Sequence, residues 1–174
     1  VIGATGYTGL DLVYMLSKHP KIKIINLCAT KNIGKKINFF DKRIKKKLPL
    51  ITSVNKINWD NIDLAFLSLP NNEAQKIIKK NFNKNKNKNI KFIDLSADFR
   101  ITDPKIYEKN YKTKHKAKKF IRHSLYSIPE FNRKIIKKYR IISNPGCYPT
   151  SIQIPLIPLI KKNLIKTNDI TIDS

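Results

Sequence analysis

Short apolar runs alternate with longer amphipathic segments along this chain of 174 residues. A run of β-branched residues followed by a helical repeat is typical of a strand and its crossover helix. The alternation predicts parallel strands covered by helices, because parallel strands are joined through such crossovers. We therefore expect an α/β fold with a doubly wound, mostly parallel sheet.

The apolar pattern also places the individual elements. A strand stub at 1–2 leads into a helix over 7–19, which Pro20 ends. The stub is too short for a buried strand and the chain begins without an initiator methionine, so we expect a truncated N-terminus. Further strands are expected at 22–29, 62–69, 90–95, 140–142 and 170–173. Further helices are expected at 72–82 and at 148–162, and Pro155 and Pro158 should kink the second of these. The regions 30–57 and 96–139 are expected to be irregular or mixed.

The net charge of +24 raises the question of nucleic-acid binding. Lysine is spread over the whole chain with asparagine and isoleucine, and the segment 81–89 is a low-complexity repeat of lysine and asparagine. We interpret the charge as a solvated basic surface that attracts anionic substrates, without specific nucleic-acid binding. A nucleic-acid-binding protein derived from a former enzyme is the alternative of a different class.

Cysteine and histidine are scarce. The two cysteines are far apart, and no pair of cysteines or histidines has the spacing of metal ligands, so no metal is expected. The sequence contains no apolar stretch long enough to cross a membrane and no recognisable targeting segment. These features favour a cytoplasmic protein in a reducing compartment, with no membrane partner.

A glycine-rich turn, G-A-T-G-Y-T-G, occupies residues 3–9 between the first strand and the first helix. Glycines at such a position let the backbone approach a pyrophosphate, which the helix N-terminus stabilises. An ordinary glycine-rich connection is the alternative interpretation. Within a βαβ unit the turn favours a dinucleotide-binding site, and Gly3, Thr5, Gly6, Tyr7, Thr8 and Gly9 are the candidate cofactor-binding residues.

The end of the second expected strand bears on the choice of cofactor. An NAD site usually places Asp or Glu there for the ribose 2′-hydroxyl. In this chain Thr30 and Lys31 occupy the position, with Lys35 and Lys36 close behind and no acidic residue between Asp11 and Asp41. A hydroxyl and ammonium groups suit a 2′-phosphate, so the sequence favours NADP.

Cys147 follows the expected strand 140–142 and begins a helix. Because chemistry in open α/β sheets lies beyond the carboxyl ends of the strands, and a helix N-terminus stabilises a thiolate, Cys147 is a candidate nucleophile. Asn144 carries an amide that could donate to a developing oxyanion. Cys28 lies inside an apolar strand and is expected to be a buried structural residue.

Four segments of the chain resemble N-acetyl-γ-glutamyl-phosphate reductases. They are residues 3–9 (G-A-T-G-Y-T-G), 93–100 (I-D-L-S-A-D-F-R), 126–130 (Y-S-I-P-E) and 143–150 (S-N-P-G-C-Y-P-T). The resemblance implies a Rossmann-type NADP-binding domain over 1–147 and the start of a truncated α+β catalytic domain over 148–174. It also implies a homo-oligomer in the full-length protein.

The resemblance further implies a reaction. In this family the cysteine that matches Cys147 forms a thioester with the acyl group of a small acyl-phosphate substrate, and NADPH reduces that thioester to a semialdehyde. The family's catalytic histidine lies downstream of the cysteine, so neither His115 nor His123 matches it, and both are expected to be exposed loop residues.

The resemblance assigns several remaining positions. Ser68 and Pro70 match the strand end beside the nicotinamide half of the cofactor, and Ser96 and Arg100 match a substrate-binding segment. From its residue type, Arg100 could clamp a carboxylate or phosphate, or could equally pair with Asp98 or Asp103. Alternative functions are an aminoadipyl-phosphate reductase, an aspartate-semialdehyde dehydrogenase and a non-catalytic NADP-binding fragment.

Overall fold

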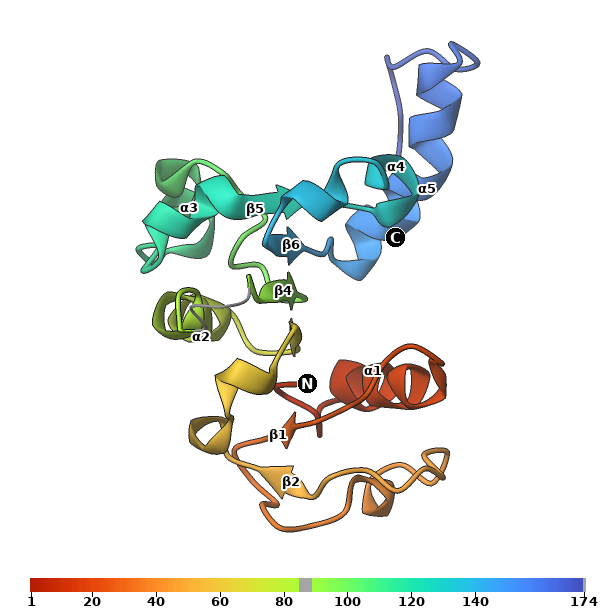
Figure 1. Ribbon diagram of the computed structural model, residues 1–174. Coiled ribbons are helices and arrows are strands. Elements are labelled where there is room, and N and C mark those ends of the chain that lie inside the picture. Colours follow the sequence, from red (N-terminus) through yellow and green to blue (C-terminus); the bar gives the residue numbers. More distant parts are fainter. Residues whose placement is uncertain (85–88, 174) are drawn as a thin grey trace.

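A computed structural model describes residues 1–84 and 89–173 of the chain. The low-complexity repeat expected at 81–89 therefore lies partly outside the described residues. Figure 1 shows the strands stacked in one column, with α1 on one side of the column and α2 and α3 on the other.

The strands form parallel ladders. One ladder pairs β1 (Leu27–Cys28) with β2 (Ile51–Thr52). The other has the order β3-β4-β6-β5, and it consists of β3 (Leu64–Leu67), β4 (Lys91–Asp94), β6 (Ile141–Ser143) and β5 (Ser124–Tyr126).

Ile2 joins the two ladders. It forms parallel bridges to Cys28 on one side and to Leu67 on the other, so the first segment of the chain lies between β1 and β3. From Ile2 the chain runs outward to β1 and β2 and then returns to β3 on the opposite side. The expected α/β class with a parallel sheet is confirmed.

Five α-helices and five short 3₁₀ segments are found in the described part of the chain. The α-helices are α1 (Tyr7–Lys18), α2 (Glu73–Asn81), α3 (Pro104–Tyr111), α4 (Pro129–Asn132) and α5 (Cys147–Lys161). The 3₁₀ segments are Ile37–Phe39, Val54–Lys56, Trp59–Asn61, Lys118–His123 and Ile136–Lys138.

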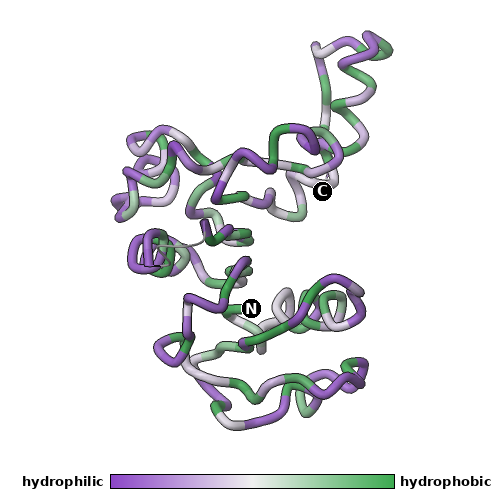
Figure 2. Tube along the Cα trace, in the orientation of Figure 1, coloured by the Kyte–Doolittle hydropathy of each residue, from purple (hydrophilic) through white to green (hydrophobic). Residues whose placement is uncertain are grey.

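The core has two parts. The larger surrounds β3, β4 and α2, where the ring of Phe82 packs between those of Phe92 and Phe120. The smaller lies between α1 and the strands β1 and β2, and includes Val13 and Leu27. Figure 2 shows hydrophilic stretches on the outer helices and loops around this column of strands.

Several expected elements differ from the structure. The strand expected at 22–29 is reduced to Leu27–Cys28, because residues 22–26 have no neighbouring strand with which to form a ladder. The expected strand at 170–173 is wrong, since these residues are exposed and unpaired. The regions 30–57 and 96–139 contain β2, β5 and α3. The helix expected at 148–162 is confirmed to within one residue at each end, with Pro155 and Pro158 inside one continuous element.

Candidate functional site

The carboxyl ends of the parallel strands meet at one edge of the sheet, where the candidate residues are expected. Thr30 comes shortly after β1, Ser68 directly after β3, Ser96 shortly after β4 and Asn144 directly after β6. The glycine-rich turn leaves the sheet at the same edge, after Ile2. The fold therefore gathers residues from four strand ends and one helix N-terminus.

Two glycines of the turn are required by the packing. Gly3 has φ +84°, and a Cβ atom there would lie 1.8 Å from the carbonyl oxygen of Ser68. A Cβ atom on Gly9 would lie 2.0 Å from the carbonyl oxygen of Gly3. Gly6, in contrast, has φ −77° and would have no contact closer than 3.7 Å. Gly3 and Gly9 thus shape the turn, and Gly6 leaves space through which a ligand can approach the backbone.

The N-terminus of α1 suits an anion. Gly6 is the N-cap residue and supplies no side-chain cap, and the first turn of α1 contains no acidic residue. The first N–H groups of a helix have no intrahelical acceptor and carry the positive end of the helix dipole. Thr5 is half-buried, whereas Tyr7 and Thr8 are exposed beside this end. The residues present therefore fit the pyrophosphate of a dinucleotide.

Positive groups dominate the segment after β1. Thr30 and Lys31 are exposed, and so are Lys35 and Lys36. The first carboxylate along this segment, Asp41, accepts hydrogen bonds from the backbone and guanidinium of Arg43 at 2.8–3.1 Å.

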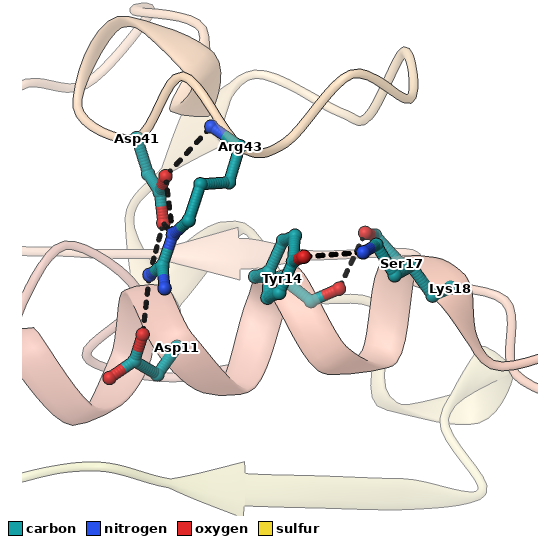
Figure 3. Close-up of polar contacts among 6 residues, drawn as sticks. All are labelled: Asp11, Tyr14, Ser17, Lys18, Asp41 and Arg43. Atoms are coloured by element: carbon teal, nitrogen blue, oxygen red, sulfur yellow. Dashed lines mark hydrogen bonds and ion pairs between the residues drawn. The ribbon is translucent and has the colours of Figure 1, made fainter.

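Arg43 also donates to Asp11 of α1, as Figure 3 shows. The hydrogen bonds from Arg43 hold the pKa of Asp41 below its usual value. Both carboxylates are therefore engaged by one guanidinium, and the lysines nearest to Thr30 keep their charge available for an anion.

Ser68 and the residues that follow it lie against the glycine-rich turn. The Ser68 N–H donates to the Ile2 carbonyl at 2.9 Å, and the Ser68 carbonyl packs against Gly3. Pro70 is exposed, and Asn71 accepts a hydrogen bond from the Ala97 N–H at 3.2 Å. The segment 68–72 thus connects the glycine-rich turn to the segment after β4.

Ser96 is buried inside its own turn. Its hydroxyl donates to Asp94 Oδ1 at 2.7 Å and accepts from the Asp98 N–H at 3.2 Å. Burial raises the pKa of Asp94 to about 6, although the hydrogen bonds from Ser96 oppose that change. Ser96 therefore supports the shape of this segment, with its hydroxyl already occupied by internal contacts.

Arg100 reaches across to the turn that precedes α5. Its Nε donates to the Asn144 carbonyl at 2.9 Å and its Nη2 to the Leu95 carbonyl at 3.1 Å. Its Nη1 lies so close to Gly146 that a Cβ atom there would be 3.2 Å away. Among the residues that the structure describes, Arg100 forms no ion pair, so the pairing with Asp98 or Asp103 that its residue type allowed is absent.

Cys147 is the first residue of α5, and its side chain is exposed. Gly146 is the N-cap residue without a side-chain cap, and no acidic residue lies in the first turn. The Asn144 side-chain amide donates to the Pro145 carbonyl at 3.0 Å, which keeps it beside this turn. Cys28 is buried as expected, and burial raises the pKa of its thiol. The two cysteines therefore differ sharply in their accessibility.

The sequence did not identify every residue of this region. His115, expected to be exposed, is buried: its Nε2 lies 2.8 Å from the Asp98 carbonyl oxygen. His123 is half-buried and also differs from the expectation. Asp98 itself is fully buried and bonded to α2, a role that no local pattern indicated.

In the described part of the chain, no group of three or more histidine, cysteine or acidic side chains could hold a metal ion. None of the helices in that part of the chain has the length and apolar character needed to cross a membrane.

This chain is similar to a known protein family and to several curated proteins. Residues 1–139 match the family model described as semialdehyde dehydrogenase, NAD binding domain. The whole chain is 38% identical to an N-acetyl-gamma-glutamyl-phosphate reductase of Afipia carboxidovorans and 42% identical to that of Ehrlichia canis, covering 50% and 49% of their lengths. It is 39% identical to a probable chloroplastic N-acetyl-gamma-glutamyl-phosphate reductase of Oryza sativa, of which it covers 41%. The chain thus spans about half the length or less of these curated relatives.

Solved structures with a similar fold include aspartate semialdehyde dehydrogenase II of Vibrio cholerae, complexed with ASA, at a TM-score of 0.61 and 18% identity. The match covers 92% of this chain and 45% of that one. The Candida albicans enzyme, solved with NADP, matches at a TM-score of 0.54 and 19% identity, covering 92% and 46%. These neighbours confirm the Rossmann-type fold, and the sequence relatives confirm the resemblance to N-acetyl-gamma-glutamyl-phosphate reductases. The chain belongs to the semialdehyde dehydrogenase family and carries its nicotinamide-cofactor-binding domain.

Proposed function

We propose that this chain supplies the NADP-binding domain and the nucleophilic thiol of an N-acetyl-gamma-glutamyl-phosphate reductase of arginine biosynthesis. The observation that carries the proposal is the exposed Cys147 at the N-terminus of α5, on the same sheet edge as the glycine-rich turn. The names of the relatives, which share 38–42% of their residues with this chain, give the substrate class.

The first step of the proposed reaction belongs to Cys147. Its thiolate attacks the acyl carbon of the acyl phosphate, a carbon–sulfur bond forms, and the carbon–oxygen bond to phosphate breaks as phosphate leaves. The positive end of the α5 dipole lies beside Cys147, where it stabilises the negative charge that develops on the substrate during the attack. Bound NADPH supplies the hydride that converts the thioester to the semialdehyde, and Cys147 is released as thiolate.

Arg100 and Asn144 organise the surroundings of the thiol. The guanidinium of Arg100 holds the Asn144 carbonyl and brings a positive charge beside Gly146, where a departing phosphate or a substrate carboxylate would be stabilised. Asn144 carries an amide that can reorient from the Pro145 carbonyl towards a developing oxyanion. His115 is not available as a general acid, because both of its ring nitrogens are occupied in the core.

We assign NADP rather than NAD to the cofactor site. The exposed Thr30 and Lys31 after β1, with Lys35 and Lys36, offer a hydroxyl and ammonium groups to a 2′-phosphate. The first carboxylate along the chain after β1, Asp41, is paired with Arg43.

The test uses the full-length protein in the reverse direction. Phosphate-dependent reduction of NADP is followed with N-acetylglutamate semialdehyde, with aspartate semialdehyde and with the aminoadipate analogue, for the wild type and for Cys147→Ala. Activity with the N-acetylated substrate alone, abolished by Cys147→Ala, is the expected result. A preference for another semialdehyde would reassign the substrate. NADP binding without activity on any of them would favour the non-catalytic alternative.

A further inference from the structure

The carboxylate of Asp98 is completely buried and accepts hydrogen bonds from three donors, which lie 26, 23 and 9 positions away along the chain. The Asn72 N–H donates to Oδ1 at 2.7 Å, and the Gln75 N–H donates to Oδ2 at 3.1 Å. The hydroxyl of Tyr107, from α3, also donates to Oδ1, at 3.1 Å. Both carboxylate oxygens are therefore used to hold other segments in place.

Two of these donors belong to the start of α2. Asn72 is the N-cap residue of that helix, has φ +74° and supplies no side-chain cap of its own. Gln75 is three residues further on, the position whose N–H a capping side chain normally receives. Asp98 thus caps α2 from a different part of the chain, and its negative charge lies at the favourable end of the helix dipole. The cap fixes the backbone where the segment 68–72 ends.

A second contact ties the same two segments together. Asn71 accepts from the Ala97 N–H, so the segment 68–72 is joined to the residues next to Asp98 at two adjacent positions. The hydroxyl of Tyr107 also accepts from the Gln75 side chain at 2.8 Å, which holds α3 against α2. Hydrogen bonds to Asp98 therefore connect the segment after β3, the segment after β4 and α3.

The strand order determines which half of a dinucleotide lies next to the segments that Asp98 holds together. A dinucleotide lies across the point where the chain direction along the sheet reverses, which here is Ile2, between β1 and β3. The ribose next to adenine is read at the end of β1, by Thr30 and Lys31, so the nicotinamide half extends over the end of β3. The segment 68–72 is that end, and it rests on the glycine-rich turn through Ser68.

We propose that Asp98 is a positioning residue that holds the segment 68–72 for the nicotinamide half of the cofactor and leaves the adenosine half unaffected. The proposal rests on the NADP-binding function proposed above. Asp98 contacts α2, α3 and the His115 loop, and none of its hydrogen bonds among the described residues involves the segment after β1.

The experiment separates the two halves of the ligand. Full-length wild type and variants are titrated calorimetrically with NADPH and with adenosine 2′,5′-bisphosphate, which lacks the nicotinamide half. Asp98→Asn retains the shape of the side chain but must present an NH₂ group to one of the two α2 N–H donors. We expect it to weaken NADPH binding about tenfold, by loss of a hydrogen bond to a charged group, and to leave the bisphosphate affinity unchanged.

Two further variants complete the design. Tyr107→Phe removes only the hydroxyl and leaves the cap of α2, so it should weaken NADPH binding to a smaller extent, again without an effect on the bisphosphate. Asp103→Asn is the matched control, because Asp103 caps α3 through the Lys105 N–H and asparagine caps equally well. It should change neither affinity.

The outcomes are distinguishable. Equal weakening of both ligands by Asp98→Asn, or no weakening of either, overturns the positioning role. If that variant does not fold, Tyr107→Phe decides, and wild-type affinity for both ligands in that variant overturns the proposal. Failure of the wild type to bind NADPH or the bisphosphate would instead sink the NADP-binding function itself.

Discussion

The Nε atom of Arg100 donates to the backbone carbonyl of Asn144 at 2.9 Å, three residues before the exposed thiol of Cys147. This bond joins the segment after β4 to the turn after β6, and the register of β4 and β6 brings the two together, since Asp94 pairs with Ser143. A second bond, to the Leu95 carbonyl, fixes the guanidinium from the other side. The turn that leads into Cys147 is therefore held by one planar side chain.

Replacement of Arg100 by lysine should distinguish the effect of its positive charge from the effect of its two hydrogen bonds. Lysine keeps the charge, but a single ammonium group cannot reproduce both hydrogen bonds of the guanidinium fork. We expect Arg100→Lys in the full-length protein to lower kcat/KM about 100-fold through misplacement of the thiol turn, with NADPH affinity unchanged. Steady-state rates and calorimetry measure the two effects. A rate within twofold of the wild type would show that the fork is dispensable.

Two glycines of the glycine-rich turn allow its structural role and its ligand-binding role to be tested separately, Gly9 for the first and Gly6 for the second. Gly9→Ala would place a Cβ atom 2.0 Å from the Gly3 carbonyl oxygen, and the backbone on both sides cannot yield. We expect a loss of more than about 3 kcal/mol of unfolding free energy, which is enough to abolish cooperative folding of a marginal domain. Thermal unfolding followed by circular dichroism measures this, and an unchanged midpoint would contradict it.

Gly6→Ala is the matched control for that experiment. Its φ of −77° is ordinary and its nearest contact would be at 3.7 Å, so its unfolding midpoint should stay at the wild-type value. NADPH affinity should nevertheless fall, because the added methyl group occupies the space through which the pyrophosphate approaches the N-terminus of α1. Unchanged affinity would place the phosphates elsewhere.

Asp94 should make the protein more stable at acidic pH than at neutral pH. Its Oδ2 has no hydrogen-bond partner among the described residues, and burial raises its pKa from 3.8 to about 6 in the folded state. The folded state therefore binds the proton more tightly than the unfolded state. The stabilisation is complete below pH 3.8 and is lost as the pH rises through about 6, a difference of about 3 kcal/mol.

Asp94→Asn removes this titration and keeps an oxygen for the two hydrogen bonds from Ser96. We expect the variant to be more stable than the wild type by about 2 kcal/mol at pH 7.5, with the gap closing towards pH 4. Urea unfolding of both proteins at pH 4, 6 and 7.5 measures the gap. A variant that is less stable than the wild type at pH 7.5 would contradict the assignment.

Local sequence signals were sufficient for part of this fold. The glycine-rich turn, α1 and the strands that end near Ser68 and Asn144 were predictable because glycine spacing and hydrophobic periodicity act over a few residues. The same signals placed Cys147 at the start of a helix. Strand lengths were less predictable. Ile22, Ile24 and Ile25 favour a strand, yet residues 22–26 have no ladder partner, because pairing is a tertiary property.

The polar contacts of the site could not be predicted from neighbouring residues either, because the partners are brought together only by the fold. Sequence proximity suggested carboxylates as partners of Arg100, whereas the folded chain offers the carbonyl of Asn144, 44 positions away. His115 stands among lysines, which favours exposure, but the carbonyl of Asp98 and the ring of Tyr107 surround it in the core. These partners lie on other elements of the fold, so the burial of His115 depends on tertiary packing and not on the residues next to it.

His115 should give a pH dependence opposite in sign to that of Asp94. The Ala117 N–H donates to Nδ1 at 3.1 Å, and Nε2 must then carry the proton that faces the Asp98 carbonyl, 2.8 Å away. The imidazole is therefore neutral, and burial lowers its pKa. A lowered pKa means that its contribution to stability is fully present above pH 6.5 and is lost as the pH falls through the folded-state pKa.

His115→Phe isolates this contribution, because a phenyl ring preserves the ring contacts with Phe99 and Tyr107 and removes both hydrogen bonds. At pH 7.5 the variant should be less stable than the wild type by about 1–3 kcal/mol, the usual effect of unpaired buried polar groups. The difference should shrink as the pH falls below 6.5, since only the wild type must then take up a proton in the core. Paired urea titrations between pH 5 and 7.5 measure it, and a difference independent of pH would mean that the ring of His115 is not confined to its neutral form in the folded state.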